Sequence, residues 1–324
     1  MALSSNSLFH FTRGGYEAIQ SILKDGFWIK YRCEDMPQNM LKGIYSSNTS
    51  ESITERDASI NEGVMFKQYL YIPMVSFCDI PLSNTREHLR FYGSEHQVEK
   101  VGKKEIKYLG YAIGLSKEWA VTKRMNPLIY IAHNSHLAQS LVYQHKLDQL
   151  KKIESWPPNI NIDPPVVYYP PVPIDLDKGI IQDQYGNQFP TSYLYVKPVS
   201  KINYHIGKEY PVRYQDEKEW RYIPDDACII YDKQRLFSSN HAIFYESFNT
   251  NRDRALKEVS DKYDNLTFSH QDITHIIVGK NEEIPAIQRE IELVYGSVAS
   301  PDELRLLYSK VTSYETLEKD VFSS

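Results

Sequence analysis

The 324-residue chain has few cysteines, and they lie far apart. Cys33, Cys78 and Cys228 are the three cysteines, and their spacing does not match that of a structural zinc site. A sparse, odd number of cysteines favours reduced thiols over a disulfide framework, which is typical of a reducing compartment. The sequence therefore predicts a cytoplasmic protein.

Long hydrophobic runs are also missing. No apolar stretch approaches the ~18 residues that a membrane-spanning helix needs. The N-terminal MALSSNSLFHF lacks the basic and then apolar order of a signal peptide. Apolar residues make up 41% of the chain and charged residues 24%, which is close to the average for soluble globular proteins. We expect a soluble protein without a membrane partner.

The chain has no surplus of positive charge. Its 37 basic and 42 acidic residues give a net charge of −5, and no long basic run occurs. Charge alone therefore does not predict tight, non-specific nucleic-acid binding through counterion release, although a local basic surface is compatible with this composition. The 25 tyrosines fit either a wet pocket or interface, or half-buried strand positions.

Several common site motifs are absent as well. The sequence contains no phosphate loop, no GxGxxG, no GxSxG and no paired CxxC. His133 and His136 have a spacing that could hold a metal, but no third ligand lies nearby in the sequence. We interpret these two histidines as polar residues at a helix start and predict no metal site.

Short apolar segments alternate irregularly with helical patterns. Strands are expected at 8–12, 70–78, 107–115, 191–197, 219–223 and 273–279. A helix should follow the first strand and end at Gly26, Ser116 is placed to cap another, and two more should cover 282–295 and 301–320. The irregular connections favour an α+β fold with a mixed or antiparallel sheet and flanking helices over a repeating βαβ sheet.

Prolines concentrate in one segment. Residues 155–178 contain seven of the 17 prolines, and such a segment resists helix and central strand. It could link two domains or run over the surface of one. We favour the surface excursion, because the strands beyond it lack a complete core of their own. We therefore expect one domain over 1–295, in which all the predicted strands share a sheet system, and a helical C-terminal extension over 296–324.

One set of residues has the chemistry needed to cleave the glycosidic bond of NAD. His10 and Thr12 lie in the first expected strand, and Glu219 lies in a later one. That bond breaks through an oxocarbenium-like sugar, which a carboxylate can stabilise, while a histidine binds the other ribose and an aromatic ring stacks on nicotinamide. Taken alone, however, a strand histidine is more often a core residue, and Glu219 could simply pair with Lys218 or Arg221.

Strand alternation predicts where these side chains point. Phe9 should enter the core, so His10 should face a cleft with a tyrosine nearby. Trp220 should also enter the core, so Glu219 should point outward or into the cleft.

Five sequence blocks resemble the AbiGi family of abortive phage resistance proteins. In order they are LFHFT…IQSILKDGF, IPMVSFCDIPLS, YAIGLSKEWA…NPLIYI, YVKP…EKEWRYIP and DITHIIVGKNEEIP, and they extend from residue 8 to about residue 295. The run VSFCDIPLS together with YAIGLSKEWA is the most specific. The resemblance implies the antitoxin-like half of a two-gene phage-exclusion system, whose partner toxin resembles a nucleotidyltransferase.

The chain also resembles, more distantly, the DarT-like ADP-ribosyltransferase toxins. They open with a His-x-Thr strand and end with a strand carrying the catalytic glutamate. The resemblance implies an ADP-ribosyltransferase-like core, with NAD as a substrate held by His10 and Thr12. His10 and Glu219 would be catalytic, and Tyr92 or Tyr111 would stack on nicotinamide.

One position departs from the toxin pattern. The toxins require an arginine just after their second strand, where this chain has Cys78 and Asp79. Arg86 and Arg90 come later and could replace it only if their helix faces the pocket.

Two functions follow from these resemblances. The first is an NAD-dependent ADP-ribosyltransferase that modifies nucleic acid or protein during infection. The second is a catalytically inactive antitoxin or sensor that binds and neutralises the toxin or recognises a phage component. Convergence of His10 and Glu219 on one cleft would favour the enzyme, and their placement on different faces would count against it.

Overall fold

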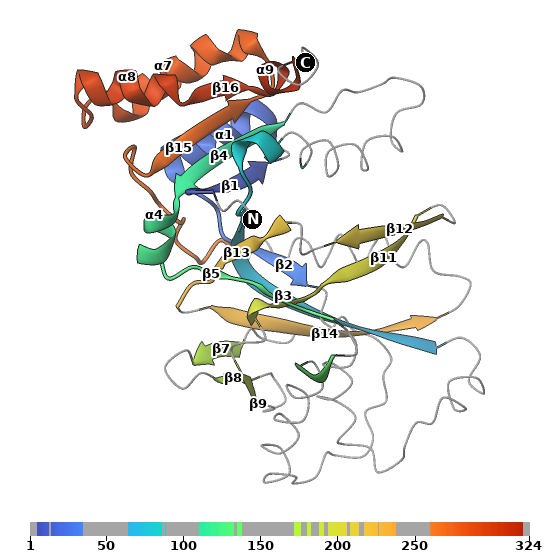
Figure 1. Ribbon diagram of the computed structural model, residues 1–324. Helices are drawn as coiled ribbons and strands as arrows, with labels where there is room; N and C mark the ends of the chain where they lie inside the picture. The colour runs from blue at the N-terminus through green and yellow to red at the C-terminus, as the bar shows by residue number, and fades with distance from the viewer. Residues whose placement is uncertain are drawn as a thin grey trace.

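A computed structural model provides the structure of the protein. It describes residues 5–12, 14–34, 64–85, 88, 110–132, 135–137, 172–175, 180–182, 188–190, 194–205, 208–213, 217–225, 227–237 and 260–319. Within these residues the protein is α+β, as the irregular pattern predicted, with a mostly antiparallel sheet and helices packed against it (Figure 1). Every helix among them is too short or too polar to cross a membrane.

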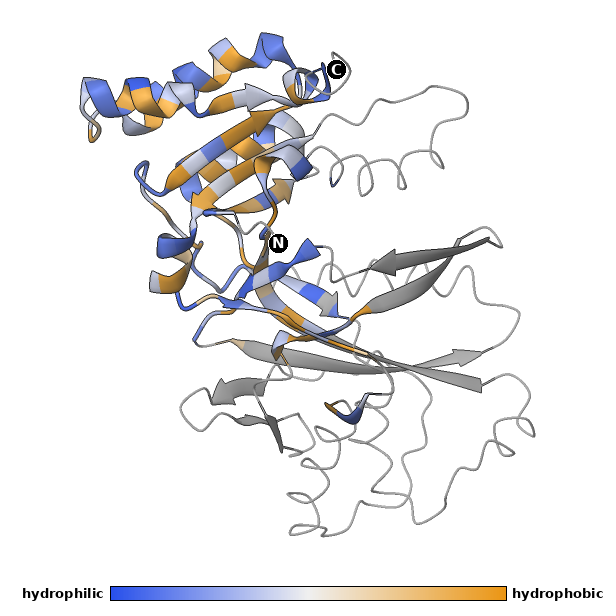
Figure 2. Ribbon diagram, viewed as in Figure 1, coloured by the Kyte–Doolittle hydropathy of each residue, from blue (hydrophilic) through white to orange (hydrophobic). Residues whose placement is uncertain are grey.

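Five strands lie side by side at one end of the sheet. Their order is β16 (Val311–Ser313), β15 (Ile273–Val278), β4 (Tyr111–Ser116), β1 (Ser7–Thr12) and β3 (Val64–Cys78). Neighbouring strands are antiparallel except β15 and β16, which are parallel. Figure 2 shows that hydrophobic residues predominate on β1, β4 and β15, next to the C-terminal helices.

The long strand β3 pairs with different strands at its two ends. Near its end, Cys78 pairs with Phe9 of β1 and with Glu219 of β13 (Glu219–Tyr222), so these two strands lie at opposite edges of β3. Nearer its start, β3 pairs with β2 (Lys30–Glu34) and β14 (Cys228–Phe237). The strand therefore connects the N-terminal and C-terminal halves of the chain.

Further short strands surround this framework. They are β5 (Asn126–Pro127), β6 (Ile129–Ile131), β7 (Val172–Asp175), β8 (Ile180–Gln182), β9 (Gln188–Pro190), β10 (Val196–Pro198), β11 (Ser200–His205) and β12 (Lys208–Arg213). The expectation that 191–197 joins the main sheet was wrong: among the described residues, β10 pairs with β6 alone, in a separate parallel pair. In the proline-rich segment, residues 172–175 form β7, and the rest lies outside the described residues.

The first helix follows its sequence pattern. Helix α1 (Gly15–Asp25) buries Ile19, Ile22 and Leu23 on one face. Gly26 follows it with a φ of +82°, and a Cβ atom there would lie 2.6 Å from the Leu266 carbonyl oxygen. Glycine is required there because an L side chain would be strained and would collide with the backbone.

The predicted cap of the next helix is confirmed. Helix α4 (Lys117–Thr122) follows β4 directly, and the Ser116 hydroxyl accepts a hydrogen bond from the N–H of Trp119 at 3.2 Å. This bond satisfies one of the backbone donors left free at a helix start.

The C-terminal region differs from the expected single helix over 301–320. Its elements are η4 (Asn281–Glu283), α7 (Ile284–Tyr295), α8 (Pro301–Ser309), β16 and α9 (Tyr314–Lys319). The β-branched Val311 and Thr312 suit a strand, and the hydroxyl of Ser313 accepts a hydrogen bond from the N–H of Thr316 at 3.0 Å at the start of α9. The segment expected as a helical extension therefore also supplies a strand of the main sheet.

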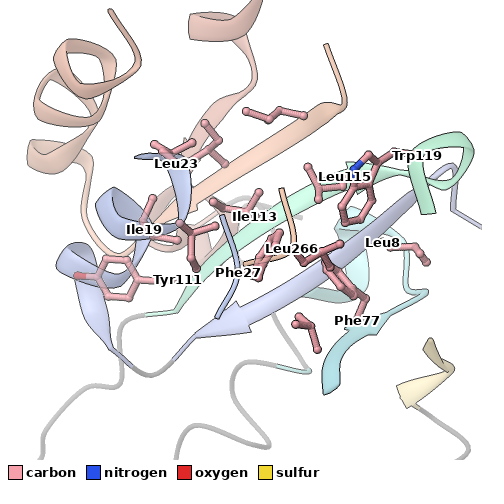
Figure 3. Packing of buried hydrophobic residues seen from close by; sticks show 14 of the residues in the cluster. Leu8, Ile19, Leu23, Phe27, Phe77, Tyr111, Ile113, Leu115, Trp119 and Leu266 are labelled. Carbon is pink, nitrogen blue, oxygen red and sulfur yellow. The ribbon is translucent and has the colours of Figure 1, made fainter. Parts of the chain in front are cut away.

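The main core lies between one face of this sheet and helices α1, α7 and α8. It includes Leu8, Phe27, Phe77, Tyr111, Ile113, Leu115 and Trp119, several of which converge in Figure 3. The opposite face of the sheet carries a smaller cluster of Phe9, Ile80, Ala112 and Ile277. Both faces of β1 are therefore covered, so one β1 face does not form an open cleft as expected.

Candidate functional site

The carboxylate of Glu219 is the centre of a buried group of charges. Glu219 is only 4% exposed and lies opposite Cys78. Its Oε1 atom accepts hydrogen bonds from Arg221 Nε and Ser76 Oγ, each at 2.8 Å. Its Oε2 atom accepts one from Lys197 Nζ, also at 2.8 Å. Both oxygens are therefore bound by donors of the protein itself. Glu219 was expected to point outward or into a cleft, and its burial shows that the outward direction was wrong.

The backbone of Glu219 is bound as well. Its N–H donates to the hydroxyl oxygen of Tyr130 at 2.8 Å, and its carbonyl accepts from the N–H of Leu128 at 2.9 Å. Both partners lie in or next to β6. Glu219 therefore attaches the separate β6–β10 pair to the main sheet.

We call the full group of charges the ion cluster, which consists of Glu34, Lys197, Glu217, Glu219 and Arg221. Arg221 is fully buried; it donates through Nη2 to Glu34, and through Nη1 to the Leu194 carbonyl at 2.7 Å. Lys197 Nζ donates also to Glu217 at 3.4 Å. Two cations thus hold three carboxylates, of which Glu34 lies far in the sequence from Glu217 and Glu219.

A turn with unusual backbone geometry supplies two of these carboxylates. Lys218 has a φ of +43°, in the left-handed region that non-glycine residues rarely adopt. It lies between Glu217 and Glu219, and its carbonyl accepts a hydrogen bond from the N–H of Asp79 at 3.1 Å. The turn brings both glutamates to Lys197.

The charges of the ion cluster stabilise one another. Burial opposes ionisation of Glu219, but Arg221 and Lys197 outweigh it and lower the pKa of this carboxyl to about 2. Burial also opposes the charge of Lys197, but the nearby carboxylates, led by Glu219, raise its pKa above the usual value. Glu219 therefore stays ionised at neutral pH, which suits an ion pair better than proton transfer.

His10 is held on the other side of the sheet. It lies opposite Ile113, a residue of the main core. Its ring centroid is 4.9 Å from that of Phe27 and 5.6 Å from that of Phe77. Its Nδ1–H donates to the Ser76 carbonyl at 2.9 Å. Burial lowers the pKa of His10 to about 4, so the ring is neutral and belongs to the aromatic core, with phenylalanines where a tyrosine was expected.

The structure does not bring His10 and Glu219 to one cleft. Directly opposed residues of antiparallel strands point to the same face of a sheet. Glu219 and Phe9 both oppose Cys78, so Glu219 shares the face of Phe9. His10, adjacent to Phe9 in β1, points to the other face.

The other predicted NAD-binding residues have structural partners or fall outside the described part. The Thr12 hydroxyl accepts a hydrogen bond from the N–H of Gly14 at 3.2 Å. The hydroxyl of Tyr111 donates to Glu283 at 2.9 Å and thereby joins β4 to η4. Three further predicted residues lie outside the described residues: Arg86, Arg90 and Tyr92.

Cys78 and Asp79, which stand where the toxins have their arginine, each contact another side chain. Cys78 Sγ lies 3.7 Å from His88 Nε2, and burial raises the pKa of this thiol. Asp79 accepts a hydrogen bond from Lys117 Nζ at 2.7 Å. Among the residues that the structure describes, no group of three or more His, Cys, Asp and Glu is placed to hold a metal ion.

Sequence reasoning missed four side-chain partners of Glu219 and Arg221, namely Glu34, Ser76, Tyr130 and Lys197. They lie far from β13 in the sequence, and no local spacing connects them. Arg221 was expected only as a neighbour that could pair with Glu219, and that pairing is present at 2.8 Å.

Comparisons with known proteins define the class. The model of the family described as abortive phage resistance protein AbiGi, antitoxin, matches residues 42–279. The chain therefore belongs to the AbiGi family. A relative from Lactococcus lactis subsp. cremoris, named abortive phage resistance protein AbiGi, is 26% identical over 268 residues, which cover 77% of this chain and 89% of the relative. No solved structure matches the chain.

Proposed function

We propose that this protein is the antitoxin of an abortive-infection system and that it acts by binding its toxin, without cleaving NAD. The family description supplies the antitoxin role. One observation favours binding over catalysis: both side-chain oxygens and both backbone groups of Glu219 are bound within the protein.

The alternative is an active ADP-ribosyltransferase. That reaction needs a carboxylate free to meet the ribose and a histidine in the same cleft. Glu219 is bound by Arg221 and Lys197, and His10 lies across the sheet. NAD as a substrate, the ADP-ribosyltransferase-like core and an acceptor on nucleic acid or protein stay predictions.

Two measurements test the proposal together. In the first, the toxin encoded with this protein is induced in cells with and without the protein, and growth is followed. In the second, the purified full-length protein is mixed with its toxin and complex formation is followed by size-exclusion chromatography. The protein, alone and with its toxin, is then incubated with labelled NAD, and released nicotinamide is measured. We expect growth to be restored, a complex to form between the two purified proteins, and no nicotinamide to be released above the level of the buffer.

A variant at the histidine makes the second measurement decisive. His10→Asn keeps a donor for the Ser76 carbonyl but removes the imidazole. Nicotinamide release by the wild-type protein that disappears in a folded His10→Asn variant would overturn the binding proposal. Toxin neutralisation without any complex between the two proteins would also contradict it.

A further inference from the structure

A run of alternating residues before and within β2 leaves three polar or aromatic side chains in solvent. Ile29 and Tyr31 are buried, at 4% and 7% exposure, whereas Trp28 is 54% exposed and Lys30 and Arg32 are also exposed. Because alternate residues of an extended segment point the same way, the three exposed side chains form one stripe. Figure 2 shows β2 as a mostly hydrophilic strand.

The stripe carries positive charge that no acidic side chain of the described residues neutralises. Lys30 Nζ lies 5.5 Å from the centroid of the Trp28 ring, within range of a cation–π contact. Within the part of the chain that the structure describes, no ion pair joins Lys30 or Arg32 to an acidic side chain. Arg221, in contrast, is fully buried against Glu34 and Glu219. The two exposed cations of the stripe, unlike Arg221, therefore face solvent without an acidic partner among the described residues.

The aromatic residue sets this stripe apart from an ordinary charged surface. An exposed indole presents a large flat face to water, on which another ring can stack. Lys30 and Arg32 are two residues apart on an extended strand, which places their backbones about 7 Å apart. The stripe thus presents one flat ring followed by two cations in a line.

We propose that Trp28, Lys30 and Arg32 bind single-stranded nucleic acid. A base would stack on the indole of Trp28, and the phosphates that follow would lie against Lys30 and Arg32. Proteins that bind single strands without sequence preference combine these two elements, aromatic stacking and a positive track. The proposal does not depend on the antitoxin role, because no residue of the stripe belongs to the ion cluster.

The occupant is a single strand for two reasons. A duplex keeps the faces of its bases stacked on one another, so its bases cannot use the ring of Trp28. An acidic protein surface would meet the two cations, but it has no planar base to stack on the indole of Trp28. The net charge of −5 also restricts binding of a polyanion to a local site such as this one.

Binding is tested with the full-length protein and a fluorescein-labelled, unstructured 20-nucleotide RNA and DNA of mixed sequence. Fluorescence anisotropy is followed at several salt concentrations. We expect a Kd on the order of 10⁻⁵ M at low salt, weakening as salt rises with a log–log slope of about −1.4 for two phosphate contacts. The matching duplex should bind at least about 5-fold more weakly, because only the single strand can stack.

Two variants separate the stacking and charge contributions. Trp28→Ala should weaken binding by about 10-fold and leave the salt slope unchanged, because stacking contributes most of its effect independently of salt. The double change Lys30→Glu and Arg32→Glu should abolish measurable binding at salt concentrations where the wild type still binds. The matched control reverses two exposed arginines on the C-terminal helices, Arg289→Glu and Arg305→Glu, and should keep wild-type affinity to within about 2-fold.

Three results would overturn the proposal. One is the absence of saturable binding by the wild-type protein at low salt. Another is an equal loss of affinity in the control variant, which would assign binding to net charge. The third is displacement of the RNA by polyglutamate at a matched charge concentration together with full binding by Trp28→Ala, which would assign the stripe to an acidic protein surface.

Discussion

His10 and Glu219 stand on opposite faces of one sheet, and Ser76 of β3 is hydrogen-bonded to both. The Ser76 carbonyl accepts a hydrogen bond from the ring Nδ1–H of His10 at 2.9 Å. The Ser76 hydroxyl donates one to the carboxylate of Glu219 at 2.8 Å. The two side chains thus add hydrogen bonds that join β3 to β1 and to β13. Substitutions at either residue are expected to act first on folding stability.

Glu219→Gln should destabilise the fold strongly. Glutamine keeps the size of the side chain but leaves Lys197 and Arg221 buried with one anion fewer. Removing one partner of a buried ion pair typically costs about 3–5 kcal/mol, and we expect a value near the lower end, because Glu34 still pairs with Arg221. Urea unfolding at neutral pH measures the change. Glu282→Gln, at an exposed side chain, is the control and should stay within about 0.5 kcal/mol of wild type. Equal stability of the two variants would contradict the prediction.

The neutral ring of His10 should make the protein sensitive to acid. Burial lowers the pKa of His10 from 6.5 to about 4, so the folded protein binds this proton less readily than the unfolded chain does. The stabilisation is complete above pH 6.5 and is lost as the pH falls toward 4, at up to about 1.4 kcal/mol per pH unit.

The variant His10→Asn isolates this effect. It retains a donor for the Ser76 carbonyl and has no titrating ring, so its stability should fall less steeply over that pH range than that of the wild type. Urea unfolding at a series of pH values gives both curves. Parallel curves for the two proteins would show that His10 does not titrate as described.

Helix α7 offers a matched pair of changes. Ile291 is fully buried in the main core, whereas Leu293 of the same helix is 77% exposed. Ile291→Ala should destabilise the fold by about 2–4 kcal/mol, because it removes buried methyl groups and leaves a cavity. Leu293→Ala should change stability by no more than about 0.5 kcal/mol. Thermal and urea unfolding check both values, and similar effects of the two changes would mean that α7 does not pack on the sheet in this orientation.

Lys218 should tolerate glycine unusually well. Its φ of +43° is strained for lysine but natural for glycine. Lys218→Gly should leave the protein as stable as wild type or stabilise it by about 0.5 kcal/mol. Lys24 lies within helix α1, and Lys24→Gly should destabilise the protein by about 0.5–1 kcal/mol. A larger loss of stability in urea unfolding for Lys218→Gly than for Lys24→Gly would exclude the strained turn.

The sequence correctly predicted the elements whose formation depends on residues close together in the chain. Strand β1 and helix α1 were predicted from apolar spacing and Gly26, and the cap of α4 was predicted from Ser116. Strand β16 was missed because three residues between two helical patterns give little signal, although the β-branched Val311 and Thr312 were its local sign.

The candidate site could not be predicted in the same way. Alternation correctly separated the two faces of β1, but it does not tell which face is covered, and in this protein both are. The environment of Glu219 depends on Lys197 and Ser76, which come from other strands. Side chains that meet only through tertiary packing leave no spacing in the sequence.

The C-terminal helices set a limit on where this chain can be divided. The family match ends at residue 279, directly after β15. The main core continues into α7 and α8 through Ile287, Ile291 and Leu307, and Tyr295 donates a hydrogen bond to the Leu23 carbonyl at 3.1 Å. A fragment ending at residue 279 would expose the apolar side of β15 and α1 and would be prone to aggregate. The segment that the family model matches is therefore smaller than the segment that contributes to the main core.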